Sequence, residues 1–101
     1  MEIEVTDNSA EHRYEIRADG KLAGFSAYRE RPGRLEFTHT EIGDEFEGQG
    51  LGSKLIGATL DDVRSRGDAV LPICPFVKAF IKRHPEYLDL VPEGERKRFE
   101  L

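Results

Sequence analysis

Three glycines, Gly48, Gly50 and Gly52, alternate in the stretch EFEGQGLGSKLI and stand directly before a segment with helical periodicity. Glycine loses more backbone freedom on folding than any other residue, so such a run needs a structural reason. A helix N-terminus exposes backbone N–H groups that lack intrahelical acceptors, together with the positive end of the helix dipole. A loop without side chains lets a phosphate approach these groups closely. The stretch therefore predicts either a phosphate-binding loop or a glycine-rich turn without a ligand.

The residues before the glycines have the pattern of an antiparallel sheet. Apolar and polar residues alternate on both sides of Asp19-Gly20, which is a strong hairpin signal. The RPGR motif at residues 31–34 marks a second turn, and MEIEVTD at the N-terminus predicts an opening strand. The segment LEFTHTEI at residues 35–42 predicts a further strand. Strict alternation in this segment places on one face Leu35, Phe37, His39 and Glu41.

The residues after the glycines change period. LGSKLIGATLDDVRSR has helical spacing and ends at Gly67, a typical C-terminal stop. DAVLPI predicts a short strand, and Pro72 favours an edge or splayed position for it. PFVKAFIKRH predicts a second helix with Pro75 at its first position and Cys74 at or next to its N-cap. The order predicts an α+β fold, a mixed-sheet α/β sandwich, in which antiparallel strands lead into a β-α-β-α unit.

Size and composition limit the function classes. The chain has 101 residues and a net charge of -5 with both signs intermixed, a surface that does not indicate nucleic-acid binding. It has no apolar run near the roughly 20 residues of a membrane span and no recognisable export signal, so a cytoplasmic location is expected. One cysteine and three scattered histidines predict neither a disulfide nor a metal site. We expect one domain over residues 1–92 and a frayed charged tail over residues 93–101; a monomer is compatible with the sequence, which does not fix the oligomeric state.

The glycine register excludes two common phosphate-binding motifs. A Walker A motif needs Gly-Lys-Ser/Thr, and none of the three glycines is followed by lysine. The dinucleotide motif G-x-G-x-x-G fails because the third glycine comes one residue early, and too little chain remains for a doubly wound sheet. Nucleotide hydrolysis and hydride transfer are therefore not expected.

The stretch EGQGLGSKLI resembles the acetyl-CoA pyrophosphate loop of the GNAT superfamily of N-acetyltransferases, with the pattern Gln/Arg-x-x-Gly-x-Gly/Ala. The pattern maps onto Glu47, Gly50 and Gly52. Glu47 departs from it, because a carboxylate cannot donate a hydrogen bond to a phosphate. Together with FTHTEI and CPFVKAFIKRHPEY, the loop resembles the small single-domain GNAT subgroup of YjdJ-like and plant minimal acetyltransferases, over roughly residues 14–87.

The resemblance implies a minimal GNAT-like fold that binds acetyl-CoA and moves the acetyl group to a primary amine, on a small molecule or on a protein or peptide. It implies that the strand backbone near Ile42 holds the pantetheine arm and that the loop holds the pyrophosphate. The implied cofactor-binding residues are Ile42, Glu47, Gly48, Gln49, Gly50, Leu51, Gly52, Ser53 and Lys54. Counter-charge for the phosphates could come from four cations, which solvated helix faces explain equally well: Lys54, Lys78, Lys82 and Arg83.

Three side chains are candidates for the chemistry. Cys74 matches the cysteine regarded as the catalytic candidate in the plant relatives, and a helix N-terminus favours the nucleophilic thiolate. It could carry the acetyl group, line the cofactor channel while the amine attacks directly, or be a buried structural cysteine. His39 and Glu41 could each act as the base that takes a proton from the amine, or be ordinary strand surface.

Two alternatives to an enzyme stay open on the sequence. The first is a non-catalytic module that binds CoA or acyl-CoA, since so short a chain leaves little surface for an acceptor. The second is a protein-interaction domain whose glycines form only a structural turn.

Overall fold

A computed structural model describes all residues, 1–101, and contains one five-stranded sheet in the order β1-β2-β3-β4-β5. Strands β1 to β4 pair antiparallel with their neighbours, whereas β5 pairs parallel with β4. The strand bounds are Ile3–Asn8 for β1, Arg13–Ala18 for β2, Lys21–Arg31 for β3, Arg34–Ile42 for β4 and Ala69–Pro72 for β5. The helix bounds are Leu51–Arg66 for α1, Pro75–Arg83 for α2 and Glu93–Arg96 for α3. The predicted mixed-sheet α/β fold is confirmed.

The turn residues determine where the strands reverse. Asp19 and Gly20 both have positive φ angles, 51° and 84°, as a two-residue hairpin loop between β2 and β3 requires. Gly33, with φ 74°, follows Pro32 in the two-residue loop between β3 and β4, an arrangement typical of a type II turn. The two predicted turns are confirmed.

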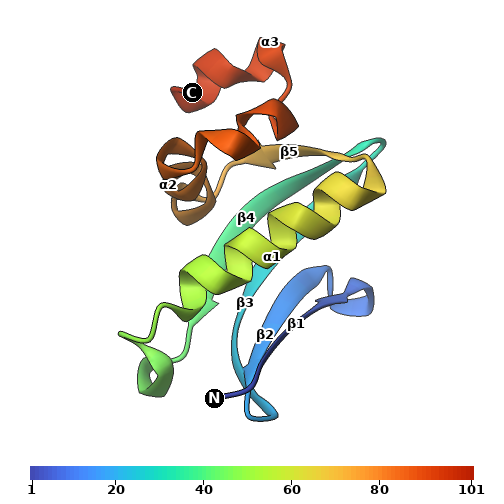
Figure 1. Ribbon diagram of the computed structural model, residues 1–101. Coiled ribbons are helices and arrows are strands. Elements are labelled where there is room, and N and C mark those ends of the chain that lie inside the picture. Colours follow the sequence, from blue (N-terminus) through green and yellow to red (C-terminus); the bar gives the residue numbers. More distant parts are fainter.

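Helix α1 lies across one face of the sheet, and α2 and α3 lie at the β5 end (Figure 1). The buried residues of α1 recur at helical spacing and pack against the apolar side chains of β2 to β5 in one core. The largest fully buried side chains of this core include Tyr14, Ile16, Leu35, Phe37, Leu55 and Leu60. No helix of the protein combines the length and apolarity needed to cross a bilayer.

A bulge in β4 changes which side chains face the core. Ala27 pairs with His39, but Tyr28 pairs with Phe37, so Thr38 is an extra residue without a partner on β3. Leu35 and Phe37 point into the core. Beyond the bulge the alternation is reversed, and His39 and Glu41 point away from it. The predicted common face for these four residues is therefore wrong, because strict alternation holds only for an unbroken ladder.

The expectation of a frayed tail is corrected by the C-terminal residues. Glu93–Arg96 form α3 and Lys97–Phe99 form a 3₁₀ turn. Phe99 is only 7% exposed and joins the core, and Leu101 packs against it. Phe99 is the one aromatic residue among charged neighbours, so its burial comes from tertiary packing that local composition does not reveal.

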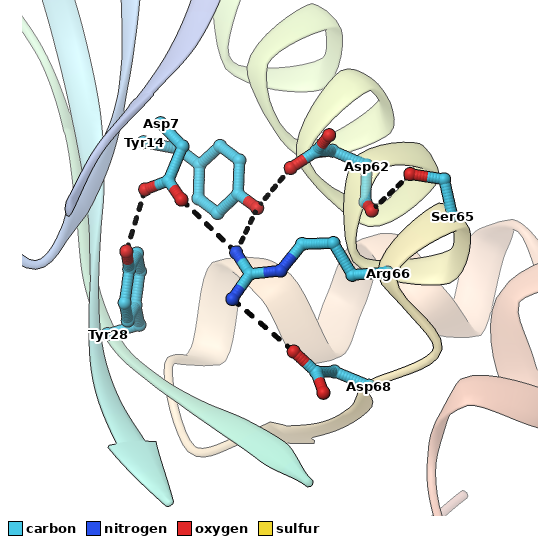
Figure 2. A network of polar contacts seen from close by, with 7 residues as sticks. All are labelled: Asp7, Tyr14, Tyr28, Asp62, Ser65, Arg66 and Asp68. Carbon is cyan, nitrogen blue, oxygen red and sulfur yellow. Dashed lines mark hydrogen bonds and ion pairs between the residues drawn. The ribbon is translucent and has the colours of Figure 1, made fainter.

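A polar network fastens the C-terminal half of α1 to the sheet (Figure 2). The Tyr14 hydroxyl donates to Asp62 at 2.6 Å, and the Tyr28 hydroxyl donates to Asp7 at 2.7 Å. Arg66 of α1 donates to Asp7 at 3.1 Å and to the Tyr14 oxygen at 3.2 Å. Burial, followed by the bond to Asp62, raises the pKa of the Tyr14 phenol above its ordinary value. The phenol therefore remains a donor at neutral pH, and the network links β1, β2, β3 and α1.

On the opposite face of the sheet, the Glu15 carboxylate is held by three neighbours although the residue is only 3% exposed. Asn8 donates to it at 3.0 Å, Arg13 at 2.8 Å and Arg17 at 3.1 Å. Burial raises the pKa of this carboxyl, but the hydrogen bonds from Asn8 and Arg13 and the charges of Arg13 and Arg17 outweigh burial. The pKa in the folded protein therefore lies below its ordinary value.

This arrangement predicts an acid-sensitive contribution to stability. A carboxyl whose pKa is lower in the folded state stabilises the fold above its unfolded-state pKa and loses that contribution as pH falls through the folded-state value. Glu15→Gln is expected to destabilise the protein by about 2 kcal/mol at pH 7 and to flatten the loss of stability below pH 5. Urea unfolding at pH 7, 5 and 3 measures both. An equal drop with falling pH in both proteins would contradict the assignment.

Candidate functional site

The glycine loop adopts a conformation that only glycine reaches easily. After a short 3₁₀ turn at Asp44–Phe46, Gly48 and Gly50 have φ angles of 82° and 73°. Gly50 is the N-cap of α1 and offers no side chain to cap the helix. A Cβ at either position would meet open space. These two glycines are therefore required by backbone conformation and not by crowding.

The loop leaves a row of backbone N–H groups without acceptors. Lys54 donates its N–H to the Gly50 carbonyl at 3.3 Å, but no N–H of residues 48–53 donates to any protein oxygen. These groups combine with the positive end of the α1 dipole. The arrangement is suited to an anion that brings several acceptor oxygens.

These residues border a cavity of about 300 Å³. Seven of the nine predicted cofactor-binding residues line it: Ile42, Glu47, Gly48, Gly50, Leu51, Gly52 and Ser53. Gln49 and Lys54 do not. Three further residues complete the lining: Phe46, Phe76 and Arg83. The two phenylalanines were not predicted, because Phe46 lacks a local motif and Phe76 comes from a different helix.

Gly52 has a different role from the other two glycines. A Cβ built on it would lie 2.7 Å from Cζ of Phe76, closer than real Cβ contacts. The absence of a side chain at Gly52 therefore leaves room for the Phe76 ring against the first turn of α1, where the ring forms part of the cavity wall. Phe76 is 38% exposed, so its ring is available to a bound molecule.

Strand β4 presents a free edge beside this cavity. Its pairing with β5 ends at Phe37 and Pro72, so residues 38–42 have no partner strand on that side. The Cys74 N–H closes the paired part by donating to the Phe37 carbonyl at 2.7 Å. The edge beyond Phe37 therefore offers backbone donors and acceptors to an extended molecule that carries amides.

Cys74 lies next to the point at which β4 and β5 separate. It is the N-cap of α2 and is 3% exposed. Its Sγ lies 3.4 Å from Oγ1 of Thr40, which in turn lies 2.9 Å from the Ser26 hydroxyl. No imidazole or carboxylate contacts the thiol. The thiol therefore has a hydroxyl as its hydrogen-bond acceptor, but no general base next to it.

His39 and Glu41 form a separate pair on the opposite side of β4. Nε2 of His39 lies 2.9 Å from Oε2 of Glu41, and the side chains are 59% and 58% exposed. The His39 ring lies against Phe25, and Glu41 borders a shallow hollow of about 180 Å³ with Phe25 and Leu22. The structure thus separates the three predicted catalytic residues into Cys74 on one side and His39 with Glu41 on the other.

The largest hollow of the molecule lies elsewhere, between α1 and the first two strands. It measures about 460 Å³ and is bordered by the carboxylates of Asp7, Asp61 and Asp62. Three carboxylates around one hollow repel a phosphate, so size alone does not identify the anion site. No group of three or more His, Cys, Asp or Glu side chains is placed to hold a metal ion.

Several solved structures share the fold of this chain. A GCN5-like protein from Staphylococcus aureus superposes with a TM-score of 0.67 at 24% identity, over 88% of this chain and 87% of that chain. N-acetylglutamate synthase from Neisseria gonorrhoeae, solved with coenzyme A and N-acetyl-glutamate, gives a TM-score of 0.50 at 19% identity, over 88% of this chain and 22% of that chain. Ard1 from Thermoplasma volcanium gives 0.51 at 21% identity, over 60% of this chain and 43% of that chain.

No curated protein sequence matches the chain significantly. A family model described as GCN5-related N-acetyl-transferase matches residues 13–90, well over half of the chain. The matched span runs from the start of β2 to the segment after α2 and includes the glycine loop and the opened edge of β4. The chain therefore belongs to the family of GCN5-related N-acetyl-transferases.

Proposed function

We propose that the protein is an acetyl-CoA-dependent N-acetyltransferase that moves an acetyl group to a primary amine. One observation carries the proposal: in a member of this family, unpaired N–H groups of residues 48–53 meet at the helix N-terminus beside a cavity. The fold neighbour from Neisseria gonorrhoeae contains coenzyme A, which supports the same cofactor here.

The residues present fit acetyl-CoA at two places. The N–H groups of residues 48–53 suit the pyrophosphate, because they lack acceptors and all of these residues except Gln49 line the cavity. The free edge of β4 as far as Ile42 suits the amides of the pantetheine arm, because an extended molecule can pair there as another strand would. Phe76 and Phe46 supply apolar wall between these places.

When bound, acetyl-CoA supplies an acetyl thioester: the amine nitrogen forms a bond to the acetyl carbon, and the carbon–sulfur bond breaks as the CoA thiolate leaves. The amine must give up a proton in this exchange. We assign that proton to His39, whose imidazole Glu41 orients through the 2.9 Å contact. Glu41 directly precedes Ile42, which lines the cavity, so the pair lies one to three residues from the cofactor site along β4, on the other face of the strand.

The surroundings of Cys74 favour direct attack by the amine over transfer through the thiol. Its one polar side-chain contact is a threonine hydroxyl, and no base lies beside it. Cys74→Ser is therefore expected to keep the rate of transfer within about threefold, because a nucleophilic role would cost a factor of 100 or more. Mass spectrometry of the protein quenched during turnover is expected to show no acetyl group on Cys74. An acetylated Cys74 with a dead serine variant would establish the thiol route instead.

The proposed function is tested by amide NMR during titration with acetyl-CoA, followed by a turnover assay that detects free CoA thiol in the presence of simple primary amines. Shifts confined to Gly48–Ser53 and residues 38–42, with release of CoA, are expected. Shifts without CoA release would identify the alternative of a non-catalytic CoA-binding module. The absence of shifts at about 1 mM ligand, a level that reports even binding of about 4 kcal/mol, would leave a protein-interaction domain with a structural glycine turn.

A further inference from the structure

The cofactor site lacks a cationic side chain within its own loop, since residues 43–53 contain neither lysine nor arginine. At position 47 the family pattern has a glutamine or arginine, but here Glu47 lines the cavity with a carboxylate. A carboxylate repels a phosphate and offers no hydrogen to it. The backbone N–H groups alone would leave the negative charge of CoA without a neutralising cation, so a cation from another part of the chain is needed.

Helix α2 brings such a cation to the same cavity. Arg83 lies seven residues after Phe76, and positions seven apart fall on the same face of a helix. Both residues line the cavity with the glycine loop. Because Gly52 leaves room for the Phe76 ring, this face of α2, which also carries Arg83, lies against the glycine loop.

Arg83 is also free to bind an anion. Its guanidinium is exposed and takes part in no ion pair or hydrogen bond within the protein. Most other arginines are engaged: Arg13, Arg17, Arg29, Arg31, Arg64, Arg66 and Arg98 pair with carboxylates, and Arg96 donates to a backbone carbonyl. Only Arg34 shares this freedom, and it stands at the opposite end of β4 from the glycine loop.

The other candidate cations are in the wrong places. Lys78 pairs with Glu100 at 3.0 Å, and Lys82 borders a different hollow with Glu100 and Leu101. Lys54 follows the loop but does not line the cavity. Of the four cations considered as counter-charge for the phosphates, only Arg83 lines the cavity.

We infer that Arg83 is the phosphate-binding side chain of the cofactor site, in place of the donor that position 47 lacks, and that it determines the preference for phosphorylated CoA over the bare pantetheine arm. The inference rests on the proposed function. A guanidinium presents several donors in a planar fork that matches phosphate oxygens, so it can offset the repulsion from Glu47.

The test compares CoA with pantetheine, which carries the arm but no phosphate, by amide NMR titration of the wild-type protein and four variants. Arg83→Gln is expected to weaken CoA binding about tenfold and to leave pantetheine binding unchanged. Arg83→Lys retains the charge and is expected to recover part of the loss. Glu47→Gln is expected to strengthen CoA binding several-fold. Arg34→Gln is the matched control, because it removes an equally unpaired arginine far from the loop, and it is expected to change neither ligand's affinity.

The outcomes separate this inference from the proposed function. Three results would overturn the role of Arg83 while CoA binding itself stands. Arg83→Gln could bind CoA as strongly as the wild-type protein, or Arg34→Gln could weaken CoA binding equally. The third result is that Arg83→Gln weakens the binding of CoA and of pantetheine equally. A wild-type protein that binds neither ligand overturns the proposed function as well. Since Arg83 is exposed and makes no internal bond, the variant is expected to fold with unchanged urea stability, which the same samples report.

Discussion

Replacing Gly50 with valine is expected to weaken acetyl-CoA binding by about 10- to 100-fold, the loss of one or two charge-assisted hydrogen bonds. Gly50 has a φ angle of 73° and caps α1, and a β-branched residue strongly resists that conformation. The loop backbone would have to change conformation, and the unpaired N–H groups of residues 48–53 would change their positions beside the cavity. Isothermal titration calorimetry with acetyl-CoA measures the loss.

Gly33→Val is the matched control for this substitution. Gly33 has a φ angle of 74° and, like Gly50, open space where a Cβ would stand. It lies in the turn between β3 and β4, away from the cavity. Both variants therefore introduce similar backbone strain, but only the Gly50 variant should lose binding. Equal affinities for acetyl-CoA in the two variants would show that the loop is a turn without a ligand.

Replacing His39 with alanine is expected to lower kcat by about 100-fold, the typical contribution of a positioned general base. The KM for acetyl-CoA should stay within about twofold of the wild-type value, because His39 does not line the cavity. Glu41→Gln removes the carboxylate that orients the imidazole and should lower kcat about tenfold. Steady-state kinetics with varied acetyl-CoA and saturating amine separates the two constants.

His12→Asn is the control for the loss of an exposed imidazole. His12 lies in the turn before β2, and asparagine tolerates its φ angle of 55°. It should leave both kcat and KM unchanged. An undiminished kcat in His39→Ala would exclude His39 and Glu41 from the mechanism and would leave Cys74 as the remaining candidate.

Local signals were enough to predict most of the fold. The turns depend on Asp19-Gly20 and Pro32-Gly33, and the helix ends depend on Gly67 and Pro75, each of which acts through the backbone of its own neighbours. The bulge at Thr38 and the buried Phe99 have no such signal. Both result from contacts with segments distant in the sequence, a register shift against β3 in one case and core packing in the other.

The candidate site likewise contains residues that local sequence signals predict and residues that only tertiary contacts bring to it. The loop residues that line the cavity all fall within residues 46–53, so the glycine pattern located most of them. Phe76 and Arg83 belong to α2 and reach the cavity through tertiary packing, in which the Phe76 ring lies against Gly52. The side of β4 occupied by His39 could not be read from alternation either, since one unpaired residue precedes it.

The bulge at Thr38 reverses the alternation of inward and outward side chains partway along β4. Before it, odd-numbered positions belong to the interior; after it, even-numbered positions do, so Thr40 faces Ser26 and Cys74 while His39 and Glu41 remain outside. The exposed His39–Glu41 pair can therefore vary in sequence without disturbing core packing. The same insertion allows the exposed side chains at the proposed catalytic positions and the buried side chains of the core to change independently along the nine residues of β4.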